Sequence, residues 1–512
     1  MTLVGSEPVS QSCAGAARQV PEDRLQVHRW SRGTAWKALF RCWLPLALVV
    51  TIGAALRLVW IDDIEYKADE EWTYHHAQSA GRTEPLSWVG MPSSAGPENP
   101  GMSLWAFMPL ARWSNDPTDL ARGIAWLSIA SILLLIAFAA CCVDRSEREA
   151  WFWAAALMSV NPLAVLHHRK IWPPCLLPML IVLFLICWWN RRRRLPAFGW
   201  GALGALIGQI HLGAFFFTAG FALWSWLWQR GGVPAVSGSP GPCARPPEMP
   251  STLLKGAWHC GNSPDSRPQG PGLPDGSPTG RPQGPGLPAS REVAWKSWLA
   301  GCVVASLPLI PWFIHVTTVS TQPHLTKIKW ARALEFKHVT RWLTEPLGIG
   351  LDHALGNDYF DFFGQPFWDG RATYLVGVLH LVSLAAGMAI GVRAVSLARG
   401  QGMSWRGLLL SRGSPTELLC NAAFWGYGLL LTISCLPIHR HYMIIVYPIE
   451  VLWFAYLALA PGGTAAASQI GRRLLATMVV CQALLSANFL IYVHHKQTID
   501  GDYGVAYGSQ QR

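Results

Sequence analysis

The stretch that decides the fold is IAWLSIASILLLIAFAACCV, residues 124–143, which contains no charged side chain. An α-helix of about 20 apolar residues is long enough to cross the hydrocarbon core of a bilayer. Comparable runs recur at Trp43–Trp60, Trp151–Leu166, Leu176–Trp189, Phe198–Trp228, Trp298–Val316, Tyr374–Ala394, Ala422–Leu436, Tyr442–Ala460 and Leu474–Val493. The sequence therefore predicts an all-α, polytopic integral membrane protein.

The composition agrees with this fold class. Of the 512 residues, 51% are hydrophobic and 14% are charged, and there are 28 tryptophans, a residue that gathers at membrane interfaces. The net charge of +11 fits an excess of Lys and Arg in cytoplasmic loops, so no nucleic-acid partner is expected. The 12 cysteines have no Cys-x-x-Cys spacing, which argues against a zinc site and against a disulfide framework.

The topology follows from the basic residues. The first apolar run lies behind a polar and basic segment and lacks a small-residue cleavage site, so it is interpreted as an uncleaved anchor. With the basic N-terminus inside the cell, the basic loops alternate with about 11 transmembrane helices. The run Phe198–Trp228 is too long for one span and is expected to break near Gln209-Ile210-His211.

These spans divide the chain into five parts. They are a cytoplasmic basic N-terminus (1–41), an N-terminal transmembrane module (42–230) with a first outer loop (61–120), an insertion (231–292), a C-terminal transmembrane module (293–493) with an outer loop (317–371), and an outer tail (494–512). The insertion is rich in Pro and Gly and repeats RPQGPGLP at residues 267–274 and 281–288. Such a composition cannot bury a core, so disorder is expected. In the tail, Tyr503–Tyr507 is expected to fold back onto the outer surface.

The first outer loop carries ADEEWTYHHA, residues 68–77, in which three carboxylates follow one another. Carboxylates are costly beside a membrane, which points to a chemical role for Asp69-Glu70-Glu71. The alternative interpretation is a solvated cap, because acidic residues favour the first turn of a helix. On this topology most histidines also fall at or near the outer surface.

Several short motifs, taken in order, resemble those of the GT-C glycosyltransferases. The closest branch is that of the protein O-mannosyltransferases and aminoarabinose transferases, which use polyprenyl-phosphate sugars. Arg57 near the end of the first run is followed by Asp69-Glu70 and Trp72, as in the first outer loop of that family. Later motifs are Asn99-Pro100-Gly101 with the amphipathic stretch Met102–Trp113, Arg122, Asn161-Pro162 with His168-Arg169, Pro311-Trp312, and Arg440-His441-Tyr442 with Tyr447-Pro448. Two positions depart from the family: Asn99-Pro100-Gly101 replaces His-Pro-Pro, and His168 replaces Ser.

The resemblance implies an inverting glycosyltransferase of the cell inner or plasma membrane, with outer-surface juxtamembrane helices in the first outer loop and an active site on the extracytoplasmic side. It implies a polyprenyl-phosphate-linked sugar as donor and a hydroxyl of a lipid, glycan or protein as acceptor. Asp69 is then the candidate base, and Glu70 positions the base or the acceptor. The candidates for holding the donor phosphate are Arg57, Arg122, Arg169, Lys170, Arg440 and His441. The resemblance implies no required cofactor and no metal site. The density of acidic residues in this loop leaves open the binding of a divalent cation.

Two other functions are consistent with the sequence. A transporter or flippase of a lipid-linked or small solute would place polar residues or broken helices near the membrane midplane. Gln209, His211 and His380 are the few residues that favour it. A non-catalytic membrane scaffold would leave the ordered Arg and Asp-Glu motifs unexplained.

Overall fold

The computed structural model of the chain describes residues 32–92, 98–230, 293–318, 329, 332, 335–400, 414–459 and 465–511, with side chains from residue 43 onward. Two compact units divide the chain, Met1–Ala47 and Leu48–Arg512, and both cavities described below lie in the second. The Pro/Gly-rich insertion and most of the basic N-terminus, both singled out in the sequence, lie outside the described residues.

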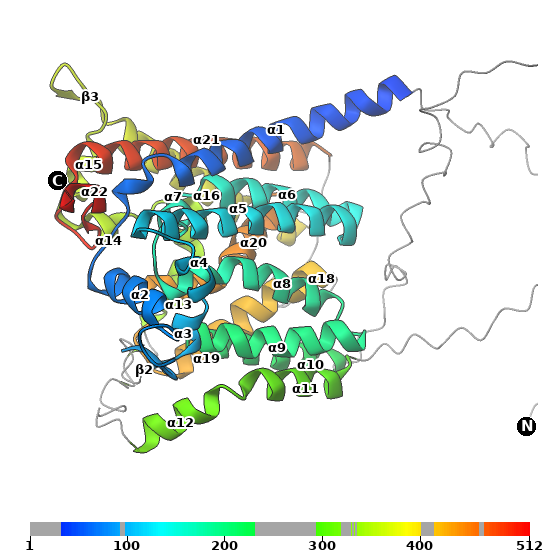
Figure 1. Cartoon of the computed structure of the whole chain (residues 1–512). Coiled ribbons are helices and arrows are strands. Elements are labelled where there is room, and N and C mark those ends of the chain that lie inside the picture. Colours follow the sequence, from blue (N-terminus) through cyan, green and yellow to red (C-terminus); the bar gives the residue numbers. More distant parts are fainter. Residues whose placement is uncertain are drawn as a thin grey trace, which may run out of the picture. The chain divides into compact units, whose positions relative to one another are not determined.

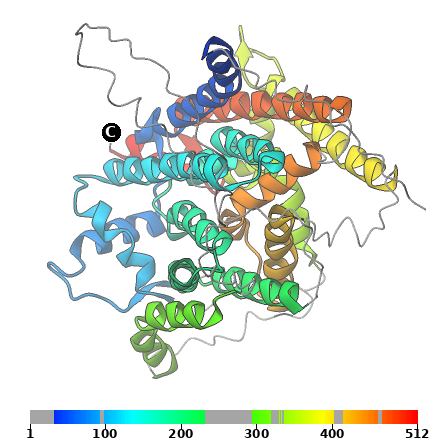
Figure 2. The same cartoon turned by 90° about the vertical axis from the view of Figure 1, so that its right-hand side faces the viewer.

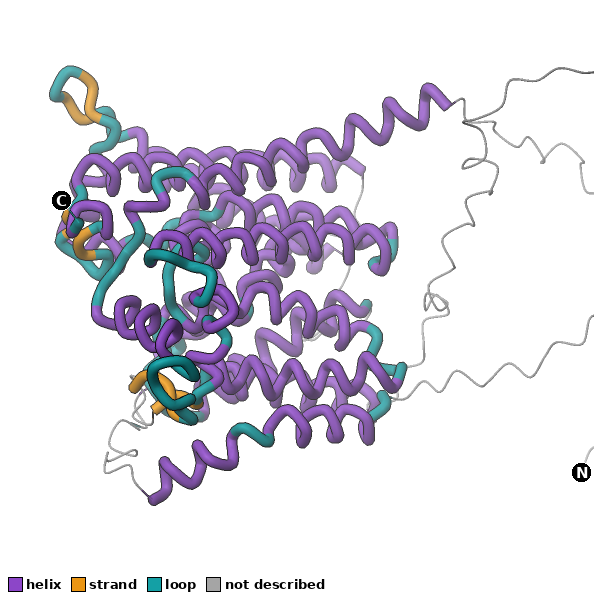
Figure 3. The backbone as a smooth tube through the Cα atoms, viewed as in Figure 1, coloured by secondary structure: helices purple, strands orange, loops and turns teal. Residues whose placement is uncertain are grey.

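Helices make up most of the described chain (Figures 1 and 3). The longer ones are α1 (Arg32–Leu58), α5 (Pro117–Cys142), α6 (Arg145–Val160), α8 (Leu177–Trp189), α9 (Arg194–Ile210), α10 (Ala214–Arg230), α11 (Trp295–Ser306), α12 (Leu309–Thr318), α16 (Leu375–Gly400), α20 (Tyr447–Leu459) and α21 (Ala465–Lys496). The shorter ones are α2 (Ala68–Ser79), α3 (Met102–Trp105), α4 (Met108–Ala111), α7 (Pro162–His167), α13 (Lys337–Thr344), α14 (Asp352–Leu355), α15 (Tyr359–Phe363), α18 (Pro415–Asn421), α19 (Gly428–Ile433) and α22 (Tyr507–Gln510).

Single turns and short strands complete the fold. The turns are η2 (Ile61–Asp63), η3 (Pro173–Leu176), η6 (Glu345–Leu347), η7 (Gly356–Asp358), η9 (Arg440–Ile445) and the π-helical η8 (Ala422–Tyr427). Three antiparallel strand pairs are β1 (Val89–Pro92) with β2 (Glu98–Pro100), β3 (Phe367–Trp368) with β4 (Arg371–Ala372), and β5 (Thr498–Ile499) with β6 (Gly504–Val505). The described chain is therefore all-α apart from these ribbons, as predicted.

Several helices have the length and hydropathy to cross a membrane. Within the described residues these are α5, α16 and α21, and the pair α11 and α12, bent by 58°, adds a fourth if it is one span. The segments Trp43–Leu58, Pro173–Trp189 and Tyr447–Leu459 are apolar but shorter. The membrane-spanning character predicted from the sequence thus rests on three or four helices, and the total of 11 stays a prediction.

Two breaks in the helices bear on the site. The chain leaves α9 at Ile210 and enters α10 at Ala214, at the position predicted from the sequence. Gly213 at this break packs so close to the Tyr442 ring that a Cβ would overlap it. The amphipathic stretch Met102–Trp113 forms two short helices, α3 and α4. Pro109 lacks the N–H that a continuous helix would need there.

Small residues let some of the long helices approach closely. α11 packs against α9, and α16 packs against α21 (Figures 1 and 2). A Cβ on Gly201 would overlap the carbonyl of Trp298, and one on Gly301 would overlap the carbonyl of Phe198. Glycines that face each other in this way allow the close backbone contact that packs helices in membranes.

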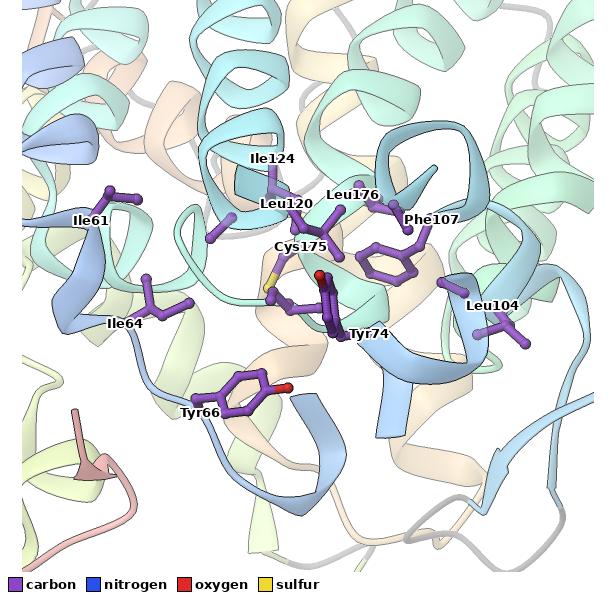
Figure 4. Close-up of a cluster of buried hydrophobic side chains, with 14 of the residues drawn as sticks. Ile61, Ile64, Tyr66, Tyr74, Leu104, Phe107, Leu120, Ile124, Cys175 and Leu176 are labelled. Atoms are coloured by element: carbon purple, nitrogen blue, oxygen red, sulfur yellow. The ribbon is translucent and has the colours of Figure 1, made fainter. Parts of the chain in front are cut away.

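The segment between α1 and α5 is fixed by its own apolar cluster (Figure 4). The Tyr74 and Phe107 side chains lie beside Leu120 and Leu176, so α2 and the α3–α4 region are held against α5 and η3. Burial of each such side chain contributes about 1.5–3 kcal/mol. In Figure 1, α2, α14, α15 and α22 lie at the left-hand end of the long helices, and this end carries the candidate site.

Candidate functional site

A cavity of about 530 Å³ lies at the end of the helices that carries α2. Its wall comes from parts of the chain that are far apart in sequence. These include the start of α2, the link between α7 and η3, the break between α9 and α10, the segment after α13, η9 and the C-terminal segment. The predicted site residues that line it are Asp69, Glu70, Lys170, Arg440 and His441.

On one side of the cavity, the ammonium of Lys170 lies between two buried carboxylates. Its Nζ is 2.7 Å from Glu65 Oε1 and 3.1 Å from Glu70 Oε1. Burial alone would lower the pKa of Lys170, but the charges of Glu65 and Glu70 outweigh burial and raise it. Burial raises the pKa of Glu70, and the charge of Lys170 opposes this effect. Lys170 therefore balances much of the negative charge of these two acids.

The two neighbouring acids of α2 differ in what holds them. Glu70 Oε2 accepts a hydrogen bond of 3.0 Å from the main-chain N–H of Lys67 at the start of α2. This bond satisfies a donor at the N-terminal end of the helix, so Glu70 caps α2, but as a buried residue and not as the solvated cap of the alternative interpretation. Asp69 is exposed and lines the cavity, and no hydrogen bond or ion pair within the described residues engages its carboxylate. Asp69 is thus free to accept a proton from a ligand.

Another part of the cavity wall is basic. Arg440 Nε lies 3.0 Å from Glu345 Oε1, and its Nη1 lies 2.8 Å from Asp352 Oδ1. Burial raises the pKa of Glu345 to about 7, against the opposing charges of Arg440 and Arg341. Arg341 also lines the cavity, and its Nη1 is buried with no hydrogen-bond partner among the described residues. This side can therefore bind an anion through a guanidinium that still has a free donor.

Neutral aromatic rings connect the two sides. The His441 ring stands edge-on to Trp172 at 4.5 Å between centroids and to His211 at 5.3 Å. Burial lowers the pKa of His211 to about 4 and that of His441 well below its usual value. Both imidazoles are therefore uncharged near neutral pH. His441 can offer a hydrogen bond to a phosphate oxygen in this state but no positive charge.

Arg57 and Arg169, both predicted to hold phosphate, do not line the cavity. Arg57 donates to the carbonyls of Gly53 at 2.8 Å, Met158 at 2.9 Å and Ser159. Arg169 donates to the carbonyl of Trp60. Carbonyls in the last turn of a helix have no partner within that helix. Arg57 satisfies such groups at the end of α6, and Arg169 also donates to the carbonyl of Leu56 in the last turn of α1 at 3.4 Å. Their guanidinium groups connect helices.

Arg122 also lies apart from the cavity. It sits on α5, where its Nη1 forms an ion pair of 2.6 Å with Asp119, and its side chain is 45% exposed. Asp119 follows Asp116, whose carboxylate caps the start of the same helix by accepting from the main-chain N–H of Thr118 at 2.7 Å. The structure therefore brings together five of the eight residues named from the sequence and leaves Arg57, Arg122 and Arg169 elsewhere.

The sequence analysis did not select Glu65, Lys67, Arg341 or Asp502, which also line the cavity. Lys67 Nζ lies 2.9 Å from Glu65 Oε1 and 3.3 Å from Asp502 Oδ1. Glu65 and Lys67 are two residues apart, and alternate residues of an extended segment face the same side. This spacing could have indicated from the sequence that the two side chains lie together. Nothing in the local sequence connects either of them with Asp502.

The C-terminal segment folds back onto the first outer loop, whereas the sequence predicted only that Tyr503–Tyr507 folds back onto the outer surface. The Tyr503 hydroxyl donates to the carbonyl of Asp63, and the main-chain N–H of Tyr507 donates to the carbonyl of Ile64 at 3.0 Å. Glu65 and Ala506 form an antiparallel bridge. This segment therefore fixes the stretch that leads into α2 and Asp69.

No group of three or more His, Cys, Asp or Glu side chains in the described part of the chain is arranged to hold a metal ion. Comparison with protein-family models, with curated proteins and with solved structures finds no match to this chain. The functional argument therefore rests on the geometry of the cavity.

Proposed function

We propose that this chain is a membrane glycosyltransferase that moves a sugar from a polyprenyl-phosphate donor to an acceptor hydroxyl. The observation that carries this proposal is the cavity itself, where the Asp69 carboxylate, unpaired among the described residues, shares one space with Lys170, Arg341 and Arg440. The cavity lies at the end of helices that are apolar enough to cross a bilayer. A donor with a phosphate head and an isoprenoid tail matches this combination of charge and surrounding apolar surface.

The residues fit a single displacement. Asp69 takes the proton of the acceptor hydroxyl while the oxygen of that hydroxyl attacks the anomeric carbon of the donor sugar. The bond from that carbon to the phosphate oxygen breaks, and its electron pair leaves with the polyprenyl phosphate. Arg341 and Arg440 stabilise the charge that develops on the departing phosphate, with Lys170 contributing from the acidic side. Attack from the face opposite the phosphate inverts the anomeric configuration.

Glu70 acts in this proposal by positioning Asp69. Its carboxylate holds Lys67 N–H at the start of α2 and Lys170 across the cavity wall. These two contacts fix the first turn of α2, on which Asp69 stands. A base must lie within hydrogen-bond reach of the proton that it removes, so an error of about 1 Å in this turn would slow transfer.

A transporter is the second candidate, and one observation favours it. Glu450 is buried in α20, and neither of its carboxylate oxygens has a hydrogen-bond partner among the described residues. A buried carboxylate in a membrane helix often belongs to a transport pathway. Gln209 and His380, which also favoured this function, are each engaged through one nitrogen: Gln209 donates to the carbonyl of Ala305 at 2.7 Å, and His380 Nδ1 lies 2.8 Å from the carbonyl of Val376. Gln209 Oε1 and His380 Nε2 are buried with no hydrogen-bond partner among the described residues.

The experiment uses the full chain in proteoliposomes that contain polyprenyl phosphates carrying radiolabelled mannose, glucose or aminoarabinose, with membrane extract as the acceptor source. Removal of a general base typically costs a factor of about 10²–10⁴, so Asp69→Asn should slow transfer by about 100-fold or more. Glu71→Gln is the matched control, because it neutralises an exposed acid two positions along the same helix. Full transfer by Asp69→Asn would overturn the assignment of the base. Movement of intact donor across the vesicle with no new product would favour the transporter.

A further inference from the structure

A second, smaller cavity of about 330 Å³ adjoins the first. Its wall includes Lys337 and Arg341 from α13, Asp352 from α14 and Arg440 from η9. Arg341 and Arg440 line both cavities, whereas Lys337 lines only the smaller one among the cavities described here. Three cationic side chains and one carboxylate give the wall of the smaller cavity a positive balance.

The helix beside this cavity has an exposed apolar side. Val339 and Leu343 on α13 are 39% and 47% exposed, and Phe336 just before it is 60% exposed. Val339 and Leu343 are four residues apart and lie on one side of α13, and together with Phe336 at its N-cap they form an exposed apolar ridge. Lys337 and Arg341, also four apart, form a basic row that faces the cavity. A helix with an apolar side and a basic side is typical of the membrane interface.

The three cationic side chains of the smaller cavity differ in how fully the protein's own acceptors already pair with them. Arg440 is held by Glu345 and Asp352. Lys337 pairs with Glu335 at 2.6 Å, but both side chains are well exposed, and such pairs contribute little. Arg341 Nη1 is buried and lacks a partner among the described residues. A buried donor without an acceptor is costly, so an anion oxygen beside Arg341 would be stabilised.

We propose that the smaller cavity binds the phosphate group of a glycerophospholipid whose acyl chains lie along the ridge of Phe336, Val339 and Leu343. Arg341 and Lys337 hold the phosphate oxygens, and the ridge lies against the chains. The ridge favours a lipid over free phosphate, because only a lipid has acyl chains that can cover exposed apolar surface. The site shares Arg341 and Arg440 with the large cavity, but binding here needs neither Asp69 nor a sugar donor and can be measured without transfer.

The test measures binding of dihexanoyl phosphatidic acid to the purified full-length protein by native mass spectrometry, with dihexanoylglycerol and inorganic phosphate as comparison probes. Phosphatidic acid should bind saturably, and dihexanoylglycerol and inorganic phosphate should each bind at least tenfold more weakly. Lys337→Gln and Arg341→Gln should each weaken the binding of phosphatidic acid about tenfold, which corresponds to about 1.4 kcal/mol. Arg371→Gln is the matched control, because it removes one exposed charge from β4 and leaves both cavities intact.

Each outcome decides one part of the proposal. Lys337 is 47% exposed, so Lys337→Gln should fold even if Arg341→Gln does not. Equal affinity of Lys337→Gln and wild type for phosphatidic acid would overturn the site. Equal affinity for inorganic phosphate and for phosphatidic acid would overturn the assignment to a lipid, and equal affinity for dihexanoylglycerol would overturn the role of the phosphate. Because none of these measurements involves sugar transfer, a negative result leaves the proposed function untouched.

Discussion

Replacing Lys170 by Met removes a buried cation from between Glu65 and Glu70. Breaking a buried ion pair by removing one partner costs about 3–5 kcal/mol, because the other charge is left uncompensated. Glu65 keeps a second cation, since Lys67 Nζ lies 2.9 Å from its Oε1. Glu70 keeps the main-chain N–H of Lys67 and loses its ion pair. We therefore expect a loss near the lower end of that range, about 3 kcal/mol in the free energy of unfolding.

The loss should depend on pH with a definite sign. Burial already raises the pKa of Glu70, and removing the opposing charge of Lys170 raises this pKa further. A carboxyl whose pKa is higher in the folded protein than in the unfolded chain destabilises the fold as pH rises through the interval between the two values. The unfolded value for Glu is about 4.3. Lys170→Met should therefore lose most stability at about pH 8 and regain much of it at about pH 5.

The assay is unfolding in mixed micelles at both pH values, followed by tryptophan fluorescence. The variant Lys170→Met/Glu70→Gln tests the cause, because it removes the uncompensated charge together with the cation and should recover part of the loss. Arg122→Met is the matched control, since Arg122 forms an exposed pair with Asp119 and such pairs contribute about 0–1 kcal/mol. Wild-type stability of Lys170→Met at high pH, or a loss that does not diminish in acid, would refute the reasoning.

Three further outcomes are expected. Wild type should bind the polyprenyl-phosphate donor more tightly below pH 7 than above it, because burial raises the pKa of Glu345 to about 7 and ionised Glu345 competes for Arg440. When donor affinity is measured across this pH range, Glu345→Gln should show no such pH dependence. Lys67→Met should accelerate hydrogen exchange in residues 497–511 severalfold, since it removes the partly exposed contact with Asp502, and equal exchange would contradict this. Arg57→Gln should lower the melting temperature but leave donor affinity unchanged at a temperature where the variant stays folded. An unchanged melting temperature with weaker donor binding would make Arg57 a phosphate ligand.

The parts of the fold that the sequence predicted depend on local properties. Apolar runs predict helices because hydropathy is read within one segment, and the break near His211 follows from a run that is too long for one span. The acidic cluster shows the limit of this approach. The sequence allowed either a cap or a base. In the structure Glu70 caps α2, and no described residue pairs with the Asp69 carboxylate. Adjacent residues of one helix point in different directions, so a cluster of acids need not share one environment.

The parts that the sequence missed depend on contacts between distant segments. Lys67 and Asp502 are separated by most of the chain, and nothing in either local sequence indicates that they meet. For Arg57 and Arg169 the structure differs from the prediction for a different reason. Arg57 and Arg169 resemble phosphate ligands by position, but helix ends leave carbonyls without partners, and a surrounding of low polarity offers no water to satisfy them. Arg57 donates to the carbonyl of Met158 in the last turn of α6, and Arg169 donates to the carbonyl of Leu56 in the last turn of α1.

This use of Arg57 and Arg169 narrows where a phosphate can bind. Arg440 is already held by two carboxylates, and Lys170 is shared by two more. Arg341 is left as the guanidinium of the large cavity with a buried, unengaged donor among the described residues, and it also faces the smaller cavity. A phosphate in either cavity would therefore draw on Arg341. Two phosphates bound at once would compete for it, so a phospholipid in the smaller cavity would change the affinity of the larger cavity for a donor without touching Asp69.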